Sequence, residues 1–168
     1  NYQGPAWYRT NINVNNPYGK DGRTLLHFEG AGQKTEVFIY TEKVGEHIGG
    51  YDEWTVDITD AISRFLANED AERFQGKIPL SIRTDNSRDL EMIPSDLSDF
   101  NLYGGLYRYI NLTYVPQNYL QTIQLNTFVT ENGKKASLSI SGTIKAHQPV
   151  TPTSIEIKIF DTNGKEVN

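Results

Sequence analysis

One loop of this chain gathers a carboxylate, an amide and an aromatic ring within five residues. Asp99, Asn101 and Tyr103 lie in the segment 93–105, a long polar stretch that ends in Gly104-Gly105. Carboxylates and amides exchange hydrogen bonds with hydroxyl groups, and an aromatic ring covers the apolar C–H face of a sugar. The loop could therefore contact a carbohydrate. In the alternative interpretation, Tyr103 and Phe100 only close the end of a sandwich and the two glycines form a turn.

A second segment of similar character is found at residues 1–9, where polar and aromatic side chains precede the first expected strand. The aromatic residues Trp7, Tyr8 and Trp54 are expected in the core or in contacts between domains, rather than as flat platforms for a ligand.

Other constellations that could do chemistry are weak. The three histidines are scattered and the chain has no cysteine, so neither a metal site nor a thiolate nucleophile is expected. Neighbouring carboxylates such as Asp57 and Asp60 could do acid–base work on a glycoside. An acidic chain produces such pairs by chance, however, and most of them form solvated faces or helix caps. The sequence contains no nucleophile elbow and no phosphate-binding glycine loop.

Composition restricts the class of protein further. The 168 residues carry 16 basic and 21 acidic side chains, and 37 % of the residues are hydrophobic, as in a folded globular chain. No apolar run approaches the roughly 18–20 residues of a membrane span. A net acidic chain without a cluster of Lys and Arg is a poor nucleic-acid binder. No targeting segment is visible, and the compartment is unknown, with a periplasmic or secreted location favoured.

The character of the chain changes near Pro116. Residues 1–116 hold 11 basic and 17 acidic side chains and 16 of the 19 aromatic residues, whereas residues 117–168 hold 5 basic and 4 acidic side chains. Pro116 follows an apolar, strand-like run and is a natural end to it. We therefore predict one domain at 1–116 and a second at 117–168.

The first domain is expected to be an all-β sandwich of the jelly-roll type. The absence of βαβ alternation favours antiparallel sheets. Glu36–Tyr40 is apolar on both faces and should be a central strand, and Trp7–Val14 alternates like a half-buried one. The other expected strands are Thr24–Phe28, Tyr51–Ile58, Ile78–Thr84 and Tyr107–Val115. Asp57 or Thr59 could cap a short helix with Ile62, Phe65 and Leu66 on one face.

The second domain contains three strand candidates. Leu120–Thr130 and Lys135–Ala146 are joined by Asn132-Gly133, a hairpin signal, and Ser154–Phe160 follows. An immunoglobulin-like sandwich needs about seven strands, and three leave an open edge and an uncovered apolar face. We expect this segment to be the truncated start of an immunoglobulin-like domain, and the chain to be a fragment of a longer protein.

Four blocks of the sequence resemble a known enzyme family. They are Gly4-x-x-Trp7-Tyr8-Arg9, Leu26-x-Phe28-Glu29-Gly30, Val44-Gly45-x-His47-x-Gly49-Gly50-Tyr51 and Asp99-Phe100-Asn101-x-Tyr103-Gly104-Gly105-Leu106-Tyr107-Arg108. In this order they resemble the N-terminal sugar-binding domain of glycoside hydrolase family 2, which includes β-galactosidases, β-glucuronidases and β-mannosidases. Residues 117–168 fit the start of the immunoglobulin-like domain that follows in this family.

The resemblance implies that the chain is a non-catalytic part of a retaining β-glycosidase of β-galactosidase type, which hydrolyses terminal β-glycosides in carbohydrate metabolism. The two catalytic glutamates of the family belong to a downstream (β/α) barrel, so the chain alone should contain no catalytic residue and be inactive. Its expected partners are its own immunoglobulin-like and barrel domains, together with the β-linked glycoside of the full-length enzyme.

The resemblance also implies roles for single residues. Asp99 is expected to reach the active site of the barrel and to touch the sugar at the −1 subsite, and Asn1 is expected to contribute similarly. Asn101 and Tyr103 complete the expected substrate-binding set. In galactosidases of this family the same aspartate can ligate sodium, so a sodium or magnesium ion is expected only in the full-length enzyme and no cofactor in this chain.

Five further residues of the motifs are expected to be structural, and they are Trp7, Arg9, Gly104, Gly105 and Arg108. Arg108 is expected to start the last strand of the first domain, where it could pair with an acidic partner or cap loop carbonyls.

Two other functions stay open. The chain could be a free-standing carbohydrate-binding module or adhesin domain, which would bind an oligosaccharide on a preformed aromatic platform. It could also be a spacer between domains, with Asp99 capping its own loop. The blocks do not identify the sugar, because galactosidases, glucuronidases and mannosidases share them.

Overall fold

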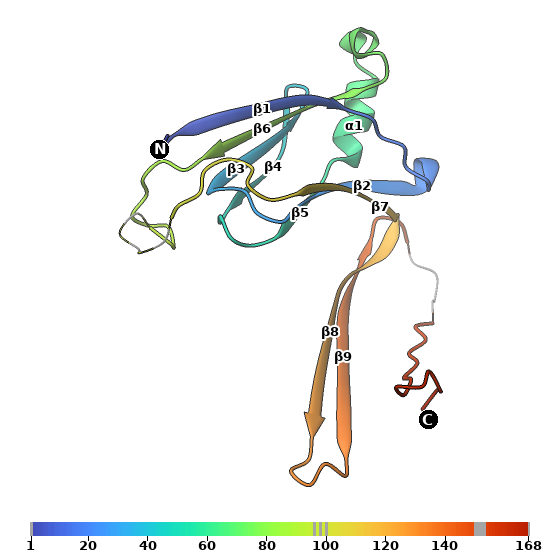
Figure 1. Ribbon diagram of the computed structural model, residues 1–168. Coiled ribbons are helices and arrows are strands. Elements are labelled where there is room, and N and C mark those ends of the chain that lie inside the picture. Colours follow the sequence, from blue (N-terminus) through green and yellow to red (C-terminus); the bar gives the residue numbers. More distant parts are fainter. Residues whose placement is uncertain (1, 96, 98, 100, 150–153, 168) are drawn as a thin grey trace. The chain divides into compact units, whose positions relative to one another are not determined.

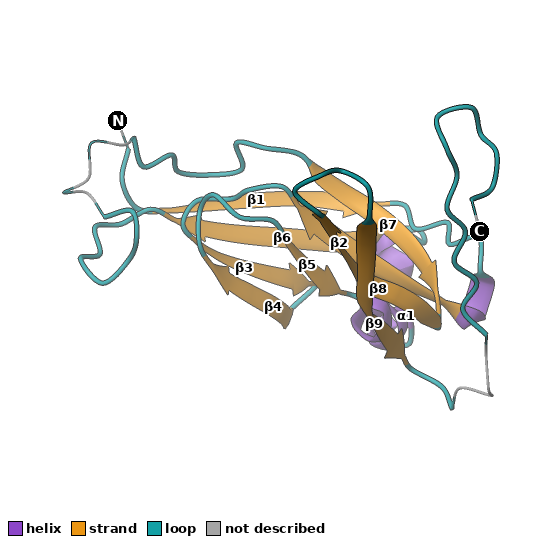
Figure 2. Ribbon diagram, turned by 90° about the horizontal axis from the view of Figure 1, so that it is seen from below, coloured by secondary structure: helices purple, strands orange, loops and turns teal. Residues whose placement is uncertain are grey.

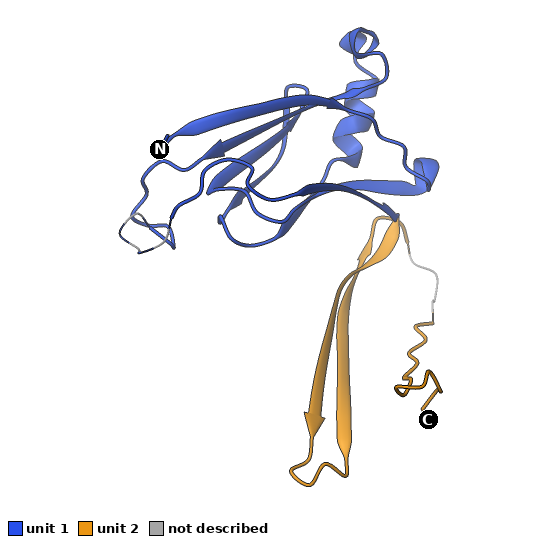
Figure 3. Ribbon diagram, in the orientation of Figure 1, with its two compact units in different colours: residues 1–116 blue, residues 117–168 orange. Residues whose placement is uncertain are grey.

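The computed structural model describes residues 2–95, 97, 99, 101–149 and 154–167. The chain divides into two compact units, Asn1–Pro116 and Gln117–Asn168 (Figure 3). The named strands of both units pair antiparallel, and the fold class is all-β, as the sequence predicts.

Two sheets form the first unit (Figure 1). The larger has the strand order β1-β6-β3-β4, and the smaller has the order β5-β2-β7. The strands of the larger sheet are β1 (Pro5–Ile12), β3 (Lys34–Ile39), β4 (Glu42–Ile48) and β6 (Ile78–Asp85). Those of the smaller sheet are β2 (Gly22–Phe28), β5 (Trp54–Asp57) and β7 (Ile110–Pro116). Short helical segments accompany the strands (Figure 2), and among the described residues they are η1 (Gly19–Asp21), α1 (Thr59–Leu66) and η2 (Glu69–Phe74).

The core follows the two-residue period of the strands. In β6 every second side chain is buried, and β3, which lies between β6 and β4, shows the same alternation. The prediction that Glu36–Tyr40 is a central strand is therefore confirmed. From the smaller sheet, the fully buried Phe28 stacks on Trp54 with 4.2 Å between ring centroids, which confirms that Trp54 packs against the core.

The predicted short helix is confirmed in α1, with one difference. Ile62 and Phe65 are buried, but Leu66 is 52 % exposed and Ala61 takes the third buried position. At the start of the helix, the Asp57 carboxylate accepts a hydrogen bond from the backbone N–H of Thr59 at 2.9 Å. Asp57 therefore satisfies one of the amide groups that the first turn leaves without a partner.

Three strand predictions need correction, and two of them concern the edges of the larger sheet. β4, which runs from Glu42 through His47 to Ile48, is not among the strands that the sequence predicts. β1 is mostly exposed rather than half-buried. β4 and β1 are edge strands. An edge strand has a neighbour on one side only, so the alternating pattern of Trp7–Val14 does not ensure that one of its faces is buried. The last strand begins at Ile110 rather than Tyr107, so Arg108 lies in the preceding loop.

The second unit contains the hairpin of β8 (Asn118–Val129) and β9 (Ala136–Ala146). Its predicted turn is confirmed, with Gly133 in the left-handed region at a φ of 64°. The prediction of a strand at Ser154–Phe160 is wrong. Among the described residues of that segment only Phe160 makes a β-bridge, to Glu166, because no neighbouring strand offers the remainder a ladder.

One face of this hairpin is apolar and exposed. Leu125 lies opposite Ile140, and Thr127 lies opposite Leu138, so apolar groups from both strands share a face. The large apolar side chains of this face are Leu120, Ile123, Leu125, Leu138, Ile140 and Ile144, each between 36 % and 64 % exposed. Two strands do not cover such a face by themselves. The immunoglobulin-like sandwich remains a prediction.

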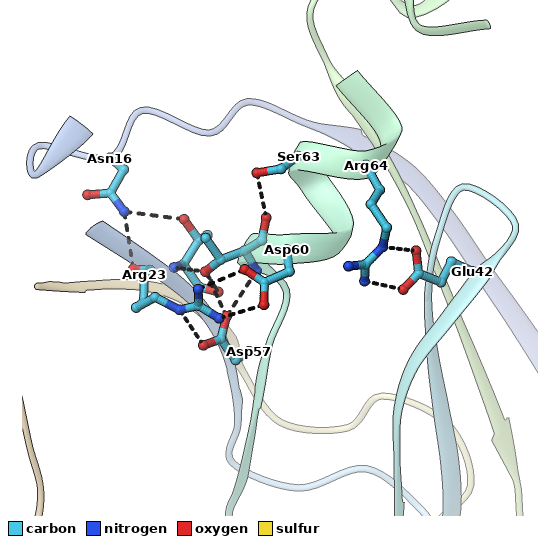
Figure 4. A network of polar contacts seen from close by, with 9 residues as sticks. Asn16, Arg23, Glu42, Asp57, Asp60, Ser63 and Arg64 are labelled. Carbon is cyan, nitrogen blue, oxygen red and sulfur yellow. Dashed lines mark hydrogen bonds and ion pairs between the residues drawn. The ribbon is translucent and has the colours of Figure 1, made fainter. Parts of the chain in front are cut away.

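A buried cation links the smaller sheet to α1 (Figure 4). Arg23 on β2 is 8 % exposed. Its Nε donates to Asp57 at 2.8 Å, and Nη1 and Nη2 donate to the two oxygens of Asp60 at 2.8 and 3.2 Å. Burial opposes the charged guanidinium, but the hydrogen bonds to Asp60 and Asp57 outweigh it and hold the pKa of Arg23 above its ordinary value. The neighbouring carboxylates Asp57 and Asp60 are thus part of the scaffold.

Removing this cation should destabilise the first unit strongly. Arg23→Met keeps the aliphatic bulk but leaves two carboxylates without their cation. We expect the free energy of unfolding to fall by about 2–4 kcal/mol, somewhat below the usual cost of breaking a fully buried pair because Asp60 is itself exposed. Urea denaturation followed by circular dichroism measures the loss.

The matched control is Arg64→Met. Arg64 also pairs with both oxygens of a carboxylate, that of Glu42, but the two side chains are 60 % and 40 % exposed. Exposed pairs contribute little to stability, because solvent screens the two charges. Equal losses for the two variants would contradict the structural role assigned to Arg23.

A second ion network, on the larger sheet, predicts a pH dependence of stability. Glu36 accepts hydrogen bonds from Lys43 Nζ at 2.7 Å and Arg83 Nη1 at 3.2 Å. The Lys43 bond is the main cause that lowers the pKa of Glu36 below its ordinary value of 4.5. A carboxyl whose pKa is lower in the folded state stabilises the fold above the ordinary value and loses that contribution as the pH falls through the folded value.

Glu36→Gln should therefore reduce the dependence of unfolding free energy on pH between about pH 5 and pH 3, by less than about 1 kcal/mol for a partly exposed pair. Urea titrations at several pH values measure the slope. The control is Glu131→Gln at the exposed hairpin turn. If Glu36→Gln left the slope as steep as the control does, the network would carry no acid sensitivity.

Candidate sugar-binding site

A hollow of about 560 Å³ lies where the N-terminal segment meets the loop that leads to β7. The start of β1 and this loop occupy the same end of the first unit (Figure 1). The volume is in the range of small-molecule sites. The residues that line the hollow are Tyr2, Gln3, Gly4, Ala6, Tyr8, Asn86, Asn101, Leu102, Tyr103, Gly104 and Gly105. The two segments that the sequence indicates, 1–9 and 93–105, thus meet in one hollow.

Asn86 contacts both of these segments. It follows β6 directly, is 5 % exposed, and accepts a hydrogen bond at Oδ1 from the backbone N–H of Gly4 at 2.9 Å. On its other side it lies against Gly104, where a β-carbon would come within 2.5 Å of Nδ2. Gly104 is required by this close approach.

The backbone of the loop also sits against the start of β3. Gly32 N–H donates to the carbonyl of Gly105 at 3.0 Å, and the two residues form a β-bridge. Gly105 has a φ of +82°, and a β-carbon there would meet the Tyr8 hydroxyl at 2.3 Å. The structural role expected for the Gly-Gly pair therefore has a physical basis in both a left-handed backbone and a lack of space.

Tyrosines surround this contact. Tyr51 Oη donates to the backbone carbonyl of Asn101, and Tyr107 Oη donates to the carbonyl of Gly50. Burial, together with the nearby Tyr51, raises the pKa of the Tyr107 phenol. The ring of Tyr103 lies 5.6 Å from that of Tyr107 and is 54 % exposed, so one of its faces is accessible to a ligand.

The four predicted binding residues do not all meet. Asn101 and Tyr103 line the hollow. Asp99 is exposed and is not among the lining residues, and Asn1 lies outside the described residues. A buried Asp99 carboxylate would favour the spacer interpretation, and Asp99 is exposed.

Two of the structural motif residues, Trp7 and Arg108, are exposed. Trp7 lies outside the core, 50 % exposed, with its ring 5.4 Å from that of Phe38 and 5.5 Å from the Arg9 guanidinium carbon. It lies on the edge strand β1, and its expected role in a contact between domains stays a prediction. Arg108 is exposed and forms no ion pair with the residues that the structure describes.

Sequence reasoning missed several lining residues, Asn86 above all. A single asparagine after a strand gives no signal of its own, because its importance comes from Gly4 and Gly104, which are distant in the sequence. The sequence indicates Tyr2, Gln3 and Tyr8 only as members of the polar, aromatic segment 1–9.

The hollow is polar but uncharged. Its described lining offers amides, phenols and backbone groups, without any Lys, Arg, Asp or Glu. Within the described part of the chain, no three potential metal ligands from His, Cys, Asp and Glu lie together. Such a surface suits hydrogen bonding to neutral hydroxyl groups.

Comparison with known proteins agrees with the sequence motifs, although no protein-family model matches the chain. A β-galactosidase of Thermoanaerobacter pseudethanolicus is 30 % identical over 97 % of this chain and 20 % of its own length. The crystal structure of Parabacteroides merdae β-glucuronidase with glycerol in its active site is 51 % identical, with a TM-score of 0.94, over 99 % of this chain and 21 % of its own. Bacteroides uniformis β-glucuronidase 3 is 51 % identical with a TM-score of 0.87.

The chain spans about a fifth of the length of these relatives. Its homologues are β-glucuronidases and β-galactosidases, the enzymes of glycoside hydrolase family 2 that the motifs resemble, and its span is consistent with an N-terminal domain of such an enzyme.

Proposed function

We propose that the chain is a non-catalytic N-terminal part of a retaining β-glycosidase, and that its loops complete the sugar pocket of a catalytic domain elsewhere in the same polypeptide. The observation that carries this proposal is the hollow that joins the segments 2–8 and 101–105 at one end of the first unit. Its amides and exposed aromatic ring have the chemistry of a sugar contact.

Uncovered apolar surface supports the presence of further domains. In the second unit the apolar face of the β8–β9 hairpin is exposed. Apolar patches of this kind mark surfaces that contact other protein. No helix among the described residues is long and apolar enough to cross a membrane.

Asp99 is the loop carboxylate that we propose to reach the sugar. It is exposed, which leaves it available to a neighbouring domain. A carboxylate that accepts a hydrogen bond from a sugar hydroxyl in a desolvated pocket contributes about 1.5–3 kcal/mol. If the bond strengthens as the sugar ring approaches an oxocarbenium ion, it raises the rate as well as the affinity.

A sodium or magnesium ion is proposed only for the full-length enzyme. Asp99 offers hard oxygen atoms to such an ion, which takes about six oxygen ligands. We propose that the other ligands come from further domains of that enzyme or from water, and no step of the reaction is assigned to an ion.

An assay has to determine which glycoside the full-length protein hydrolyses, because β-galactosidases and β-glucuronidases both match the chain. The galactosidase type predicted from the sequence therefore stays a prediction, because a β-galactosidase at 30 % identity and β-glucuronidases at 51 % identity both match. Since the hollow carries no cation among its described lining residues, recognition of a glucuronate carboxylate would fall to residues outside it.

The chain of residues 1–168 should not hydrolyse 4-nitrophenyl β-galactoside or β-glucuronide, because the acid and nucleophile that such hydrolysis requires are proposed to lie in another domain. The full-length protein should hydrolyse one of the two. Release of nitrophenol measures both. Turnover by the purified chain that persists through repeated chromatography would contradict the proposal, as would a full-length protein inactive on both glycosides.

In the full-length protein, Asp99→Ala should lower kcat/KM by about 10- to 100-fold, the equivalent of one charge-assisted hydrogen bond. Its melting temperature should stay nearly unchanged, because Asp99 is exposed in the first unit. The matched control is Asp21→Ala, which removes another exposed carboxylate, that of η1. A variant with unchanged kcat/KM would show that Asp99 does not reach the substrate.

A further inference from the structure

The amide of Asn86 is held in one orientation. Its Oδ1 accepts the hydrogen bond from Gly4 N–H at 2.9 Å, an interaction that spans 82 residues of sequence. Because a backbone N–H can only donate, the atom facing Gly4 is the oxygen, and Nδ2 is directed to the other side. That side adjoins Gly104, which lines the hollow as Asn86 itself does.

Nδ2 is a donor that the described residues leave free. Asn86 as a whole is 5 % exposed, but Nδ2 makes no hydrogen bond to the part of the chain that the structure describes, and it is not one of the fully buried atoms there that lack a partner. Nδ2 is therefore accessible in the wall of the hollow that Asn86 lines. Because the bond to Gly4 fixes the orientation of the amide, this donor is held ready for an acceptor supplied from the hollow.

We propose that Asn86 is a ligand-binding residue of this hollow, whose Nδ2 donates a hydrogen bond to a hydroxyl oxygen of a neutral sugar unit. The inference rests on the proposed function, and it adds to it a residue that lies in neither of the two loop segments and the chemical class of the ligand group. Asn86 also positions the site, because the same amide ties the N-terminal segment to the loop at Gly104.

The neutral class follows from the lining. The described wall of the hollow consists of amides, phenols, backbone groups and short aliphatic side chains. A ligand carboxylate placed there would lose its hydration without gaining a cation, which is unfavourable. A hydroxyl group loses less, and it can accept from Nδ2 while donating to an amide or phenol oxygen.

The test is a titration of the ¹⁵N-labelled chain, followed by two-dimensional NMR, with methyl β-galactoside in one arm and methyl β-glucuronide in the other. We expect the side-chain amide resonances of Asn86 to shift with those of the Asn101 and Gly104 backbone amides, and to saturate at millimolar galactoside, with a Kd on the order of 1–10 mM. The glucuronide should bind at least about threefold more weakly.

Two outcomes would overturn the inference. Shifts at Asn101 and Gly104 without a shift of the Asn86 side chain would mean that the hollow binds sugar through other groups. A spectrum unchanged by the galactoside up to about 100 mM would mean that this hollow has no such ligand. Neither outcome depends on the glycosidase assay of the full-length protein, which tests the proposed function separately.

Variants separate the two roles of the amide. Asn86→Asp at neutral pH keeps the acceptor for Gly4 but has no donor in place of Nδ2, and we expect it to weaken galactoside binding about three- to tenfold. The matched control is Asn68→Ala, because Asn68 also accepts from a backbone N–H, that of Asp70 at 2.9 Å, but lies outside the hollow. Undiminished binding by a folded Asn86→Asp variant would show that Nδ2 has no ligand.

Discussion

The candidate site depends on how closely separate pieces of backbone approach one another at one end of the first unit. A β-carbon on Gly32 would lie 1.9 Å from the carbonyl oxygen of Tyr103, a distance that only a glycine avoids. The hydrogen bond from Gly32 to Gly105 holds the loop at that place. The loop side of the hollow, with Asn101 and Tyr103, adjoins this contact, while the hydrogen bond between Gly4 and Asn86 holds the N-terminal side.

The scaffold behind the hollow is held by different forces. Alternating side chains of β3 and β6 pack against Phe28 and its neighbours, and this apolar burial supplies most of the stability. The buried Arg23 adds direction, because its fixed donors match the carboxylates of Asp57 and Asp60 in only one arrangement of β2, β5 and α1. Packing therefore brings the sheets together, while the ion cluster sets where the helix starts.

Some buried polar groups of the first unit form no hydrogen bond to the described residues. The hydroxyls of Thr35 and Thr84 and the indole nitrogen of Trp54 are buried without a hydrogen-bond partner among the described residues. Thr35 and Thr84 face each other across β3 and β6. Polar groups in this state reduce the net stability of a fold, whereas the Asn86 amide, which borders the hollow, is open to a ligand.

Local patterns predicted the elements whose two faces differ. Residues 78–84 alternate clearly because one face of β6 is buried. Asn132-Gly133 marks the turn between β8 and β9, because the left-handed backbone that Gly133 adopts suits a tight hairpin. The same reasoning failed at β4, where both faces are polar, and at Ser154–Phe160, where the pattern is present but no strand lies beside it. The alternation of apolar and polar residues predicts a strand reliably only where one face of the strand is buried and the other is exposed.

By itself the sequence determined the all-β class, the antiparallel pairing, the change of character near Pro116 and the two segments whose chemistry suits a sugar. Those features follow from the composition and from the spacing of residues that are close together in the sequence. Only the tertiary structure decided that the two segments share one hollow, that Asn86 connects them, and that Asp99 stands apart from it. Contacts such as that of Gly4 with Asn86 join residues 82 positions apart, and no local pattern encodes which distant partner a residue meets.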